Sequence, residues 1–212
     1  MMLRTIFDEI KYSRWRDMLL PDNSSKNVDH YRRFIFVHNP KCAGTTIKKI
    51  FGPWFPGDHR VPTVLVSPKI WERYFSFVVI RNPFERLVSS FSYHTASDYK
   101  GFYFAKYPFL HSLSLEAYFD LMSAETDALR PNIDFVSHKL SDKPIDFICR
   151  FENLEQDIIK VLYRLNIAVD TVPQENKSKH KAYVEYFADN PRLLEKCRLY
   201  YKDDLDAFGY EF

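Results

Sequence analysis

The hydrophobic positions of this chain form short apolar runs that alternate with segments of helical spacing. Phe34–Val37 and Phe75–Ile80 are rich in aromatic and β-branched residues, which predicts two buried strands. The alternating residues Ile145–Phe151 predict a third strand. Because strands and helical segments alternate along the chain, the pattern predicts an α/β fold with a central parallel β-sheet flanked by α-helices.

Capping residues mark where the helices are expected to begin. Thr45 and Thr46 are expected to cap a helix that follows Gly44, and Asn82-Pro83 predicts the start of a second helix. Asn153 is expected to cap another helix, which ends near residue 165. Further helices are predicted for 1–20, 114–123 and 191–204, and loops for 21–30, 95–112 and 130–143. The last of these loops also suits a short strand or turn. The aromatic loop 95–112 suits either a substrate-facing flap or a packed cover, and the pattern does not choose between them.

The segment between the first strand and the first helix has the chemistry of an anion site. It reads H-N-P-K-C-A-G-T-T from His38 to Thr46. Pro40 ends the strand, Gly44 permits a tight turn, and a helix N-terminus directs backbone N–H groups toward an anion. A nucleoside-triphosphate loop would have Lys directly after its second Gly, whereas Lys41 precedes Gly44 by three residues. The loop therefore predicts a site for phosphate or a similar oxyanion that differs from a nucleoside-triphosphate loop.

Composition narrows the class of protein. The 212 residues are 46% apolar and 27% charged, as in a folded globular chain, and the net charge of +2 argues against dedicated nucleic-acid binding. Cys42, Cys149 and Cys197 have neither metal-site nor disulfide-framework spacing, and no carboxylate pair suits Mg²⁺, so no metal is expected. Cys42 is expected to offer its backbone N–H rather than a reactive thiol.

The anion loop resembles the 5′-phosphosulfate loop of the sulfotransferases, which is usually written around P-K-x-G-x-T-S/T. It is most similar to the carbohydrate-type branch, whose loop often reads H-I-P-K-T-G-G-T-S. Ala43 stands where many members have Gly, which restricts the loop backbone. The resemblance implies a single P-loop-like domain over residues 33–212, after an N-terminal helix-and-loop extension over 1–32. It also implies cofactor binding by Lys41, Cys42, Ala43, Gly44, Thr45 and Thr46.

A second block, R-N-P-F-E-R-L-V-S-S-F from Arg81 to Phe91, resembles the family pattern R-D/N-P-x-x-R-x-x-S-x-Y/F. That pattern binds the 3′-phosphate of the cofactor in the family. The resemblance implies that Arg81 and Ser89 are phosphate ligands and that Arg86 supports the fold.

Two further blocks extend the resemblance toward the end of the chain. R-F-E-N-L, residues 150–154, resembles the R-x-E-x-L that precedes a helix in the family. The tail resembles the family pattern N-x-S followed by Y-x-x-D-L/F-x-x-F/L-G-Y. The N-x-S part implies that Lys177 and Ser178 close over the cofactor, although a polar surface loop is an alternative interpretation.

The family reaction is sulfuryl transfer from 3′-phosphoadenosine 5′-phosphosulfate (PAPS) to a hydroxyl, which releases 3′,5′-adenosine bisphosphate (PAP). Lys41 is expected to neutralise charge on the departing phosphate. His59 is expected to be the general base, because carbohydrate-type relatives often have a histidine in a similar position and its pKa is suitable. Rival candidates for the base are His38, His94, Glu72 and Glu85.

The expected function is therefore sulfation of a hydroxyl on a carbohydrate or glycoconjugate. A small-molecule kinase of the P-loop type is disfavoured by the missing Gly-Lys-Ser/Thr, and a non-catalytic nucleotide-binding module by the intact Lys41, Arg81 and Ser89. The charged N-terminus, the lack of an apolar membrane span and the lack of a disulfide framework favour a cytoplasmic protein. The resemblance to the compact bacterial members of the family implies a bacterial protein, with a trimmed Golgi lumenal domain as the alternative. The sequence identifies neither the acceptor nor the oligomeric state.

Overall fold

The computed structural model describes residues 26–52, 55, 57–168, 171–173 and 180–212. Within it the chain forms two compact units, and each unit draws on two separate stretches of sequence. The first unit contains the described residues of Met1–Ile80 and Asp134–Asn176, and the second contains those of Arg81–Ile133 and Lys177–Phe212. The predicted helix over 1–20 lies outside the described residues.

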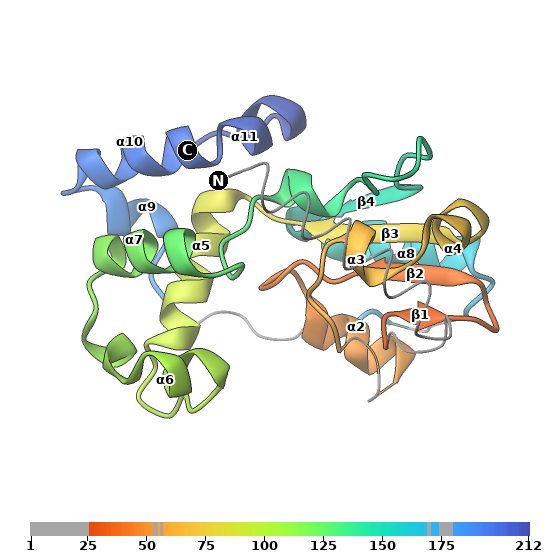
Figure 1. Ribbon diagram of the computed structural model, residues 1–212, viewed down its shortest axis with the longest axis horizontal. Coiled ribbons are helices and arrows are strands. Elements are labelled where there is room, and N and C mark those ends of the chain that lie inside the picture. Colours follow the sequence, from red (N-terminus) through yellow and green to blue (C-terminus); the bar gives the residue numbers. More distant parts are fainter. Residues whose placement is uncertain (1–25, 53–54, 56, 169–170, 174–179) are drawn as a thin grey trace. The chain divides into compact units, whose positions relative to one another are not determined.

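A four-stranded sheet organises the first unit (Figure 1). Its strands, in spatial order, are β1 (Val28–Asp29), β2 (Phe34–Val37), β3 (Phe75–Ile80) and β4 (Phe147–Arg150). The pairs β2–β3 and β3–β4 are parallel, and β1 runs antiparallel to β2. The three predicted strands and the α/β class are thus confirmed. The loop predicted for 21–30 is wrong where β1 forms, because a two-residue strand has no hydrophobic period to detect.

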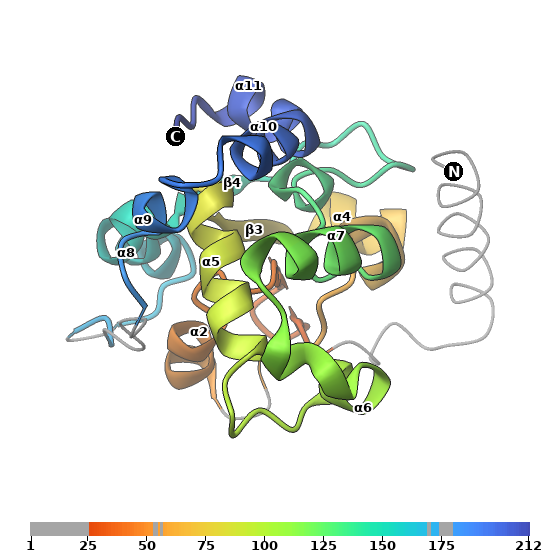
Figure 2. The ribbon, with the colours of Figure 1, turned by 90° about the vertical axis from the view of Figure 1, so that its left-hand side faces the viewer.

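Helices of the first unit lie on both sides of the sheet. Phe34, Phe36 and Phe77 pack with Ile47 of α2 (Gly44–Phe51) and Ile158 of α8 (Leu154–Arg164). Figure 2 shows α2 and α8 on one side of the strands and α4 on the other. Because side chains alternate along a strand, the residues between the phenylalanines face the opposite side. Two short helices on the chain between β2 and β3 are α3 (Pro62–Leu65) and α4 (Pro68–Arg73).

The start of α8 differs from the prediction. Asn153 occupies the N-cap position, but its side chain makes no capping hydrogen bond, because a 3₁₀ turn, η3 (Phe151–Asn153), leads directly into the helix. The side chain of Asp157 instead accepts a hydrogen bond from the Arg150 amide at 2.9 Å. That bond ties the end of β4 to the first turn of α8.

The second unit is helical and is built around α5 (Pro83–His94). Figures 1 and 2 show α7, α9 and α10 around it. Phe84, Leu87 and Val88 of α5 form a buried cluster with residues of these neighbours, among them Tyr118. The remaining helices of this unit are α6 (Phe102–Lys106), η1 (Pro108–Ser112), α7 (Leu115–Glu125), α9 (Tyr183–Phe187), α10 (Pro191–Tyr200) and α11 (Lys202–Phe208). The short turn η2 (Asn132–Phe135) contains residues of both units.

Two predictions for this helical part need correction. The single helix predicted for 191–204 is interrupted at Tyr201, which ends α10 and precedes α11. Tyr201 is fully buried, and the interruption allows its ring to enter the core. The segment 95–112, predicted as an irregular loop, contains the short helices α6 and η1.

Candidate active site

The loop between β2 and α2 has an unusual backbone. Lys41 and Ala43 have φ angles of 62° and 58°, in a left-handed region that costs a non-glycine residue roughly 1–2 kcal/mol. Cys42 between them lacks a positive φ, so the sign of φ alternates from Lys41 to Ala43. The Cys42 amide donates to the Asn39 carbonyl at 3.3 Å and its thiol is fully buried, so the side chain is part of the core.

The N-terminus of α2 follows directly from this loop. Its first hydrogen bond runs from the Ile47 amide to the Ala43 carbonyl at 3.1 Å, so the amides that precede Ile47 point out of the helix end. Ala43 is the N-cap, and the helix begins at Gly44. The prediction that Thr45 and Thr46 cap α2 is therefore wrong, because both threonines lie within its first turn.

Gly44 lies directly against the imidazole of His38. A Cβ atom at Gly44 would lie 2.1 Å from His38 Nε2 and 2.6 Å from Cε1, so only glycine fits beside this ring. His38 is buried and stacks on Phe36, with the ring centroids 5.4 Å apart. Burial lowers the pKa of His38 well below its ordinary value, and the nearby His59 lowers it further. His38 is therefore neutral at pH 7.

His59 packs against His38, with the ring centroids 4.0 Å apart. Its Nδ1 lies 3.2 Å from the His38 carbonyl oxygen. Because a carbonyl only accepts, the neutral His59 ring carries its proton on Nδ1 and keeps Nε2 as a proton acceptor. His59 is exposed whereas His38 is buried, so His59 is the histidine of this pair that a bound substrate can reach.

Four local effects set the charge state of His59. Partial desolvation of the packed ring lowers the pKa of His59 and outweighs the hydrogen bond to His38 and the charge of Asp58, which both raise it. The positive charge of Lys41 lowers this pKa further. His59 is therefore mainly neutral at pH 7, and the structure brings Lys41, His38 and His59 together in the first unit.

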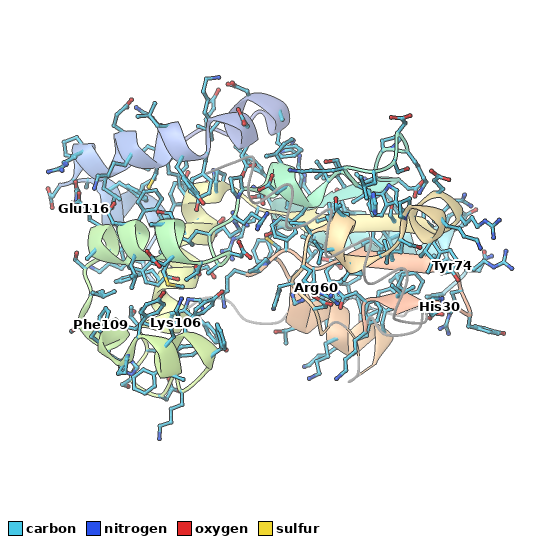
Figure 3. All side chains as sticks on the ribbon, viewed as in Figure 1. His30, Arg60, Tyr74, Lys106, Phe109 and Glu116 are labelled. Atoms are coloured by element: carbon cyan, nitrogen blue, oxygen red, sulfur yellow. The ribbon has the colours of Figure 1, made fainter. Side chains whose placement is uncertain are left out.

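Asn27 holds the turn that precedes His59, and sequence reasoning did not identify it. Its Nδ2 donates to the Asp58 carbonyl at 2.6 Å, and its Oδ1 accepts from the Gly57 and Asp58 amides at 2.9 and 3.0 Å. Asn27 is fully buried, and Arg60, labelled in Figure 3, forms an ion pair with the Asp58 carboxylate. No sequence signal marked Asn27, because it lies in a polar stretch without a motif.

The second unit contains Arg81 and Ser89. Arg81 is buried, and its Nη2 bonds Glu85 Oε1 at 2.8 Å, across the first turn of α5. Glu85 and Ser89 are four residues apart on this helix, which places their Cβ atoms about 5–6 Å apart on one face. Arg81 and Ser89 therefore lie on the same side of α5, with Glu85 between them.

The rival bases have other surroundings. Glu85 is the ion-pair partner of Arg81, and Glu72 is exposed and accepts a hydrogen bond from Ser141 at 3.3 Å. His94 belongs to the second unit and is buried, with its Nδ1 2.6 Å from the Tyr118 hydroxyl. Lys177 and Ser178 lie outside the described residues.

Comparison with known proteins gives one match. The family model described as "Sulfotransferase family" matches residues 58–211, which is more than two thirds of the chain. The chain belongs to the sulfotransferase family. The matched region of this sulfotransferase begins one residue before His59 and includes Arg81 and Ser89, whereas the loop with Lys41 precedes it. No curated protein and no solved structure matches the chain.

Family membership makes the protein an enzyme of sulfuryl transfer, and sulfotransferases generally use PAPS as the sulfuryl donor. Among the described residues of this sulfotransferase, none of the helices is both long enough and apolar enough to cross a membrane. In the same part of the chain, no three His, Cys, Asp or Glu side chains are grouped as possible metal ligands.

Proposed function

We propose that this sulfotransferase transfers a sulfuryl group from PAPS to a hydroxyl of a carbohydrate or glycoconjugate and releases PAP. The observation that carries the choice of donor is the arrangement of Arg81, Glu85 and Ser89 at the start of α5. A buried arginine with a serine on the same helix face suits a phosphate monoester. Such a site favours PAPS over ATP, because only PAPS has a 3′-phosphate.

The cofactor groups are divided between two sets of residues. By the family resemblance, Lys41 and the loop from Cys42 to Thr46 take the 5′-phosphosulfate. The N-terminus of α2 supports that role, because its amides before Ile47 point out of the helix end. Arg81 and Ser89 take the 3′-phosphate, and one guanidinium has enough N–H groups to bind Glu85 and a phosphate together. Lys177 and Ser178 remain proposed ligands on the resemblance alone.

Lys41 and His59 are the proposed catalytic residues. When bound, PAPS supplies the sulfuryl group and a phosphate leaving group. His59 Nε2 takes the proton of the acceptor hydroxyl, because Nδ1 donates to the His38 carbonyl and the ring is mainly neutral at pH 7. Lys41 stabilises the negative charge that develops on the leaving phosphate.

The carbohydrate acceptor is proposed from the resemblance of the loop to the carbohydrate-type branch. In the second unit, the rings of Tyr93, Phe102 and Phe109 are exposed. Figure 3 labels Phe109 together with Lys106 from α6. Exposed aromatic faces suit the apolar faces of sugar rings, and a nearby ammonium group suits an anionic glycan.

The test is transfer of radiolabelled sulfate from PAPS to a panel of oligosaccharides. We expect His59→Asn to lower kcat by about 10²–10⁴-fold, the usual contribution of a general base, while PAP affinity stays within about twofold. His111→Asn is the matched control, because exposed His111 also lies with its Nδ1 3.2 Å from a backbone carbonyl, that of Thr95. Equal turnover by His59→Asn and wild type would contradict the assigned base, and the absence of transfer to any glycan would contradict the acceptor class.

A further inference from the structure

The carboxylate of Asp204 is fully buried in the second unit. It is linked by hydrogen bonds to the residues that precede α5. Its Oδ2 accepts hydrogen bonds from the Asn132 amide at 2.7 Å and from Asn132 Nδ2 at 2.8 Å. Its Oδ1 accepts from the Ile133 amide at 2.8 Å. Asp204 thus fixes both the backbone and the side chain of Asn132, which is itself fully buried.

Asn132 in turn is hydrogen-bonded to the backbone of Arg81. Its Nδ2 also donates to the Arg81 carbonyl oxygen at 3.0 Å, so one amide group joins Asp204 to the backbone of Arg81. The guanidinium of Arg81 is held separately by Glu85, at 2.8 Å. The direction of the Arg81 side chain is therefore defined at both ends, at its backbone by Asn132 and at its tip by Glu85.

The end of the chain holds the next residue, Asn82. Asn82 Nδ2 donates to the Glu211 carbonyl at 2.9 Å, while its Oδ1 accepts from the Phe84 amide at 3.0 Å and caps α5. The ring of Phe212 packs edge-on against Phe84, with the centroids 5.2 Å apart. Segment 201–212 therefore contacts both residues that precede α5, through Asn132 in one case and directly in the other.

The Y-x-x-D part of the C-terminal pattern consists of Tyr201 and Asp204. Asp204 is linked to Arg81 through Asn132, and Tyr201 lies against Arg86. The guanidinium of Arg86 lies 5.8 Å from the Tyr201 ring centroid and donates to the Arg130 carbonyl at 2.6 Å. A buried charge adds little stability by itself, because apolar side chains of similar volume often stabilise a core as well or better. The buried carboxylate of Asp204, which fixes Asn132, therefore points to a need for accurate placement of Arg81.

We propose that Asn132 and Asp204 are positioning residues for Arg81, so that the C-terminal Y-x-x-D pattern serves recognition of the 3′-phosphate. This inference rests on the proposed function, in which Arg81 binds that phosphate. Neither residue is assigned a contact with the cofactor. Their effect is transmitted through the Arg81 carbonyl and should therefore be specific for ligands that carry a 3′-phosphate.

The test compares PAP with 5′-AMP, which lacks the 3′-phosphate, by calorimetric titration of wild type, Arg81→Ala, Asn132→Ala and the double variant. We expect Asn132→Ala to weaken PAP binding about 10-fold, as supporting residues around a binding site commonly do, and to leave AMP binding unchanged. The double variant should bind PAP no more weakly than Arg81→Ala. If Asn132→Ala does not fold, Asn132→Ser and Asp204→Asn replace it in the same comparison.

The matched control is Asn190→Ala. Asn190 caps α10 in the same unit, through Oδ1 to the Leu193 amide at 2.9 Å, without a bond to Arg81. The Asn190→Ala variant should have a lower free energy of unfolding and unchanged affinities for PAP and AMP. Equal weakening of PAP and AMP by Asn132→Ala, or a loss of PAP affinity that adds to that of Arg81→Ala, would overturn the positioning role. Absence of PAP binding by wild type would instead overturn the proposed function and, with it, this inference.

Discussion

The surroundings of His59 determine its chemistry at the scale of single residues. Desolvation lowers its pKa, and Lys41 lowers it while Asp58 raises it. We therefore expect the His59 ring to titrate below pH 6.5 in an NMR pH titration. Lys41→Met should raise this midpoint because it removes a repelling positive charge, and Asp58→Asn should lower it. A midpoint at or above 6.5, or one unmoved by Lys41→Met, would contradict this description of the site.

The requirement for glycine at position 44 is a second residue-scale property. A Cβ there would lie 2.1 Å from His38 Nε2. Gly44→Ala should therefore lower the free energy of unfolding by about 1–3 kcal/mol, the usual cost of overpacking. His38→Ala removes the obstructing ring, so the double variant should lose less stability than the sum of the two single variants. Strict additivity in urea unfolding would show that the imidazole does not impose the glycine.

Helix α5 connects structure and proposed function at the scale of elements. Asn82→Ala removes the N-cap at the head of this helix, and Ser114→Ala removes the equivalent cap of α7, in which Ser114 Oγ accepts from the Ala117 amide at 3.2 Å. Each variant should lose about 1 kcal/mol of stability in thermal or urea unfolding. Only Asn82→Ala should also weaken PAP binding, since Asn82 adjoins Arg81. Equal PAP affinity for both variants would contradict a link between the Asn82 cap and recognition of the 3′-phosphate.

The elements also show how far the sequence can be interpreted alone. The apolar runs at 34–37 and 75–80 predict their strands because buried parallel strands need apolar side chains on both faces. The interruption at Tyr201 could not be predicted, because it depends on a tertiary site for the ring. Neither Asn27 nor Asn132 has a local signal, since Asn27 bonds residues about 30 positions away and Asn132 bonds Asp204 at a separation of 72 positions.

At the scale of the whole molecule, the proposed cofactor ligands come from both compact units. Lys41 and His59 belong to the first, and Arg81 and Ser89 belong to the second. The family match over 58–211 includes residues of both. Motifs in the sequence predicted these two sets of residues, whereas the division of the chain into units depends on long-range packing that no motif encodes.

The most direct test of the central claim is calorimetric titration with PAP, repeated with ATP and Mg²⁺, on wild type and Arg81→Ala. We expect wild type to bind PAP without metal, and Arg81→Ala to weaken binding by about 10–100-fold through loss of a charged hydrogen-bond donor. ATP with Mg²⁺ should bind more weakly than PAP. Binding of ATP with Mg²⁺ but not of PAP would contradict PAPS as the donor and would favour a phosphoryl-transfer enzyme.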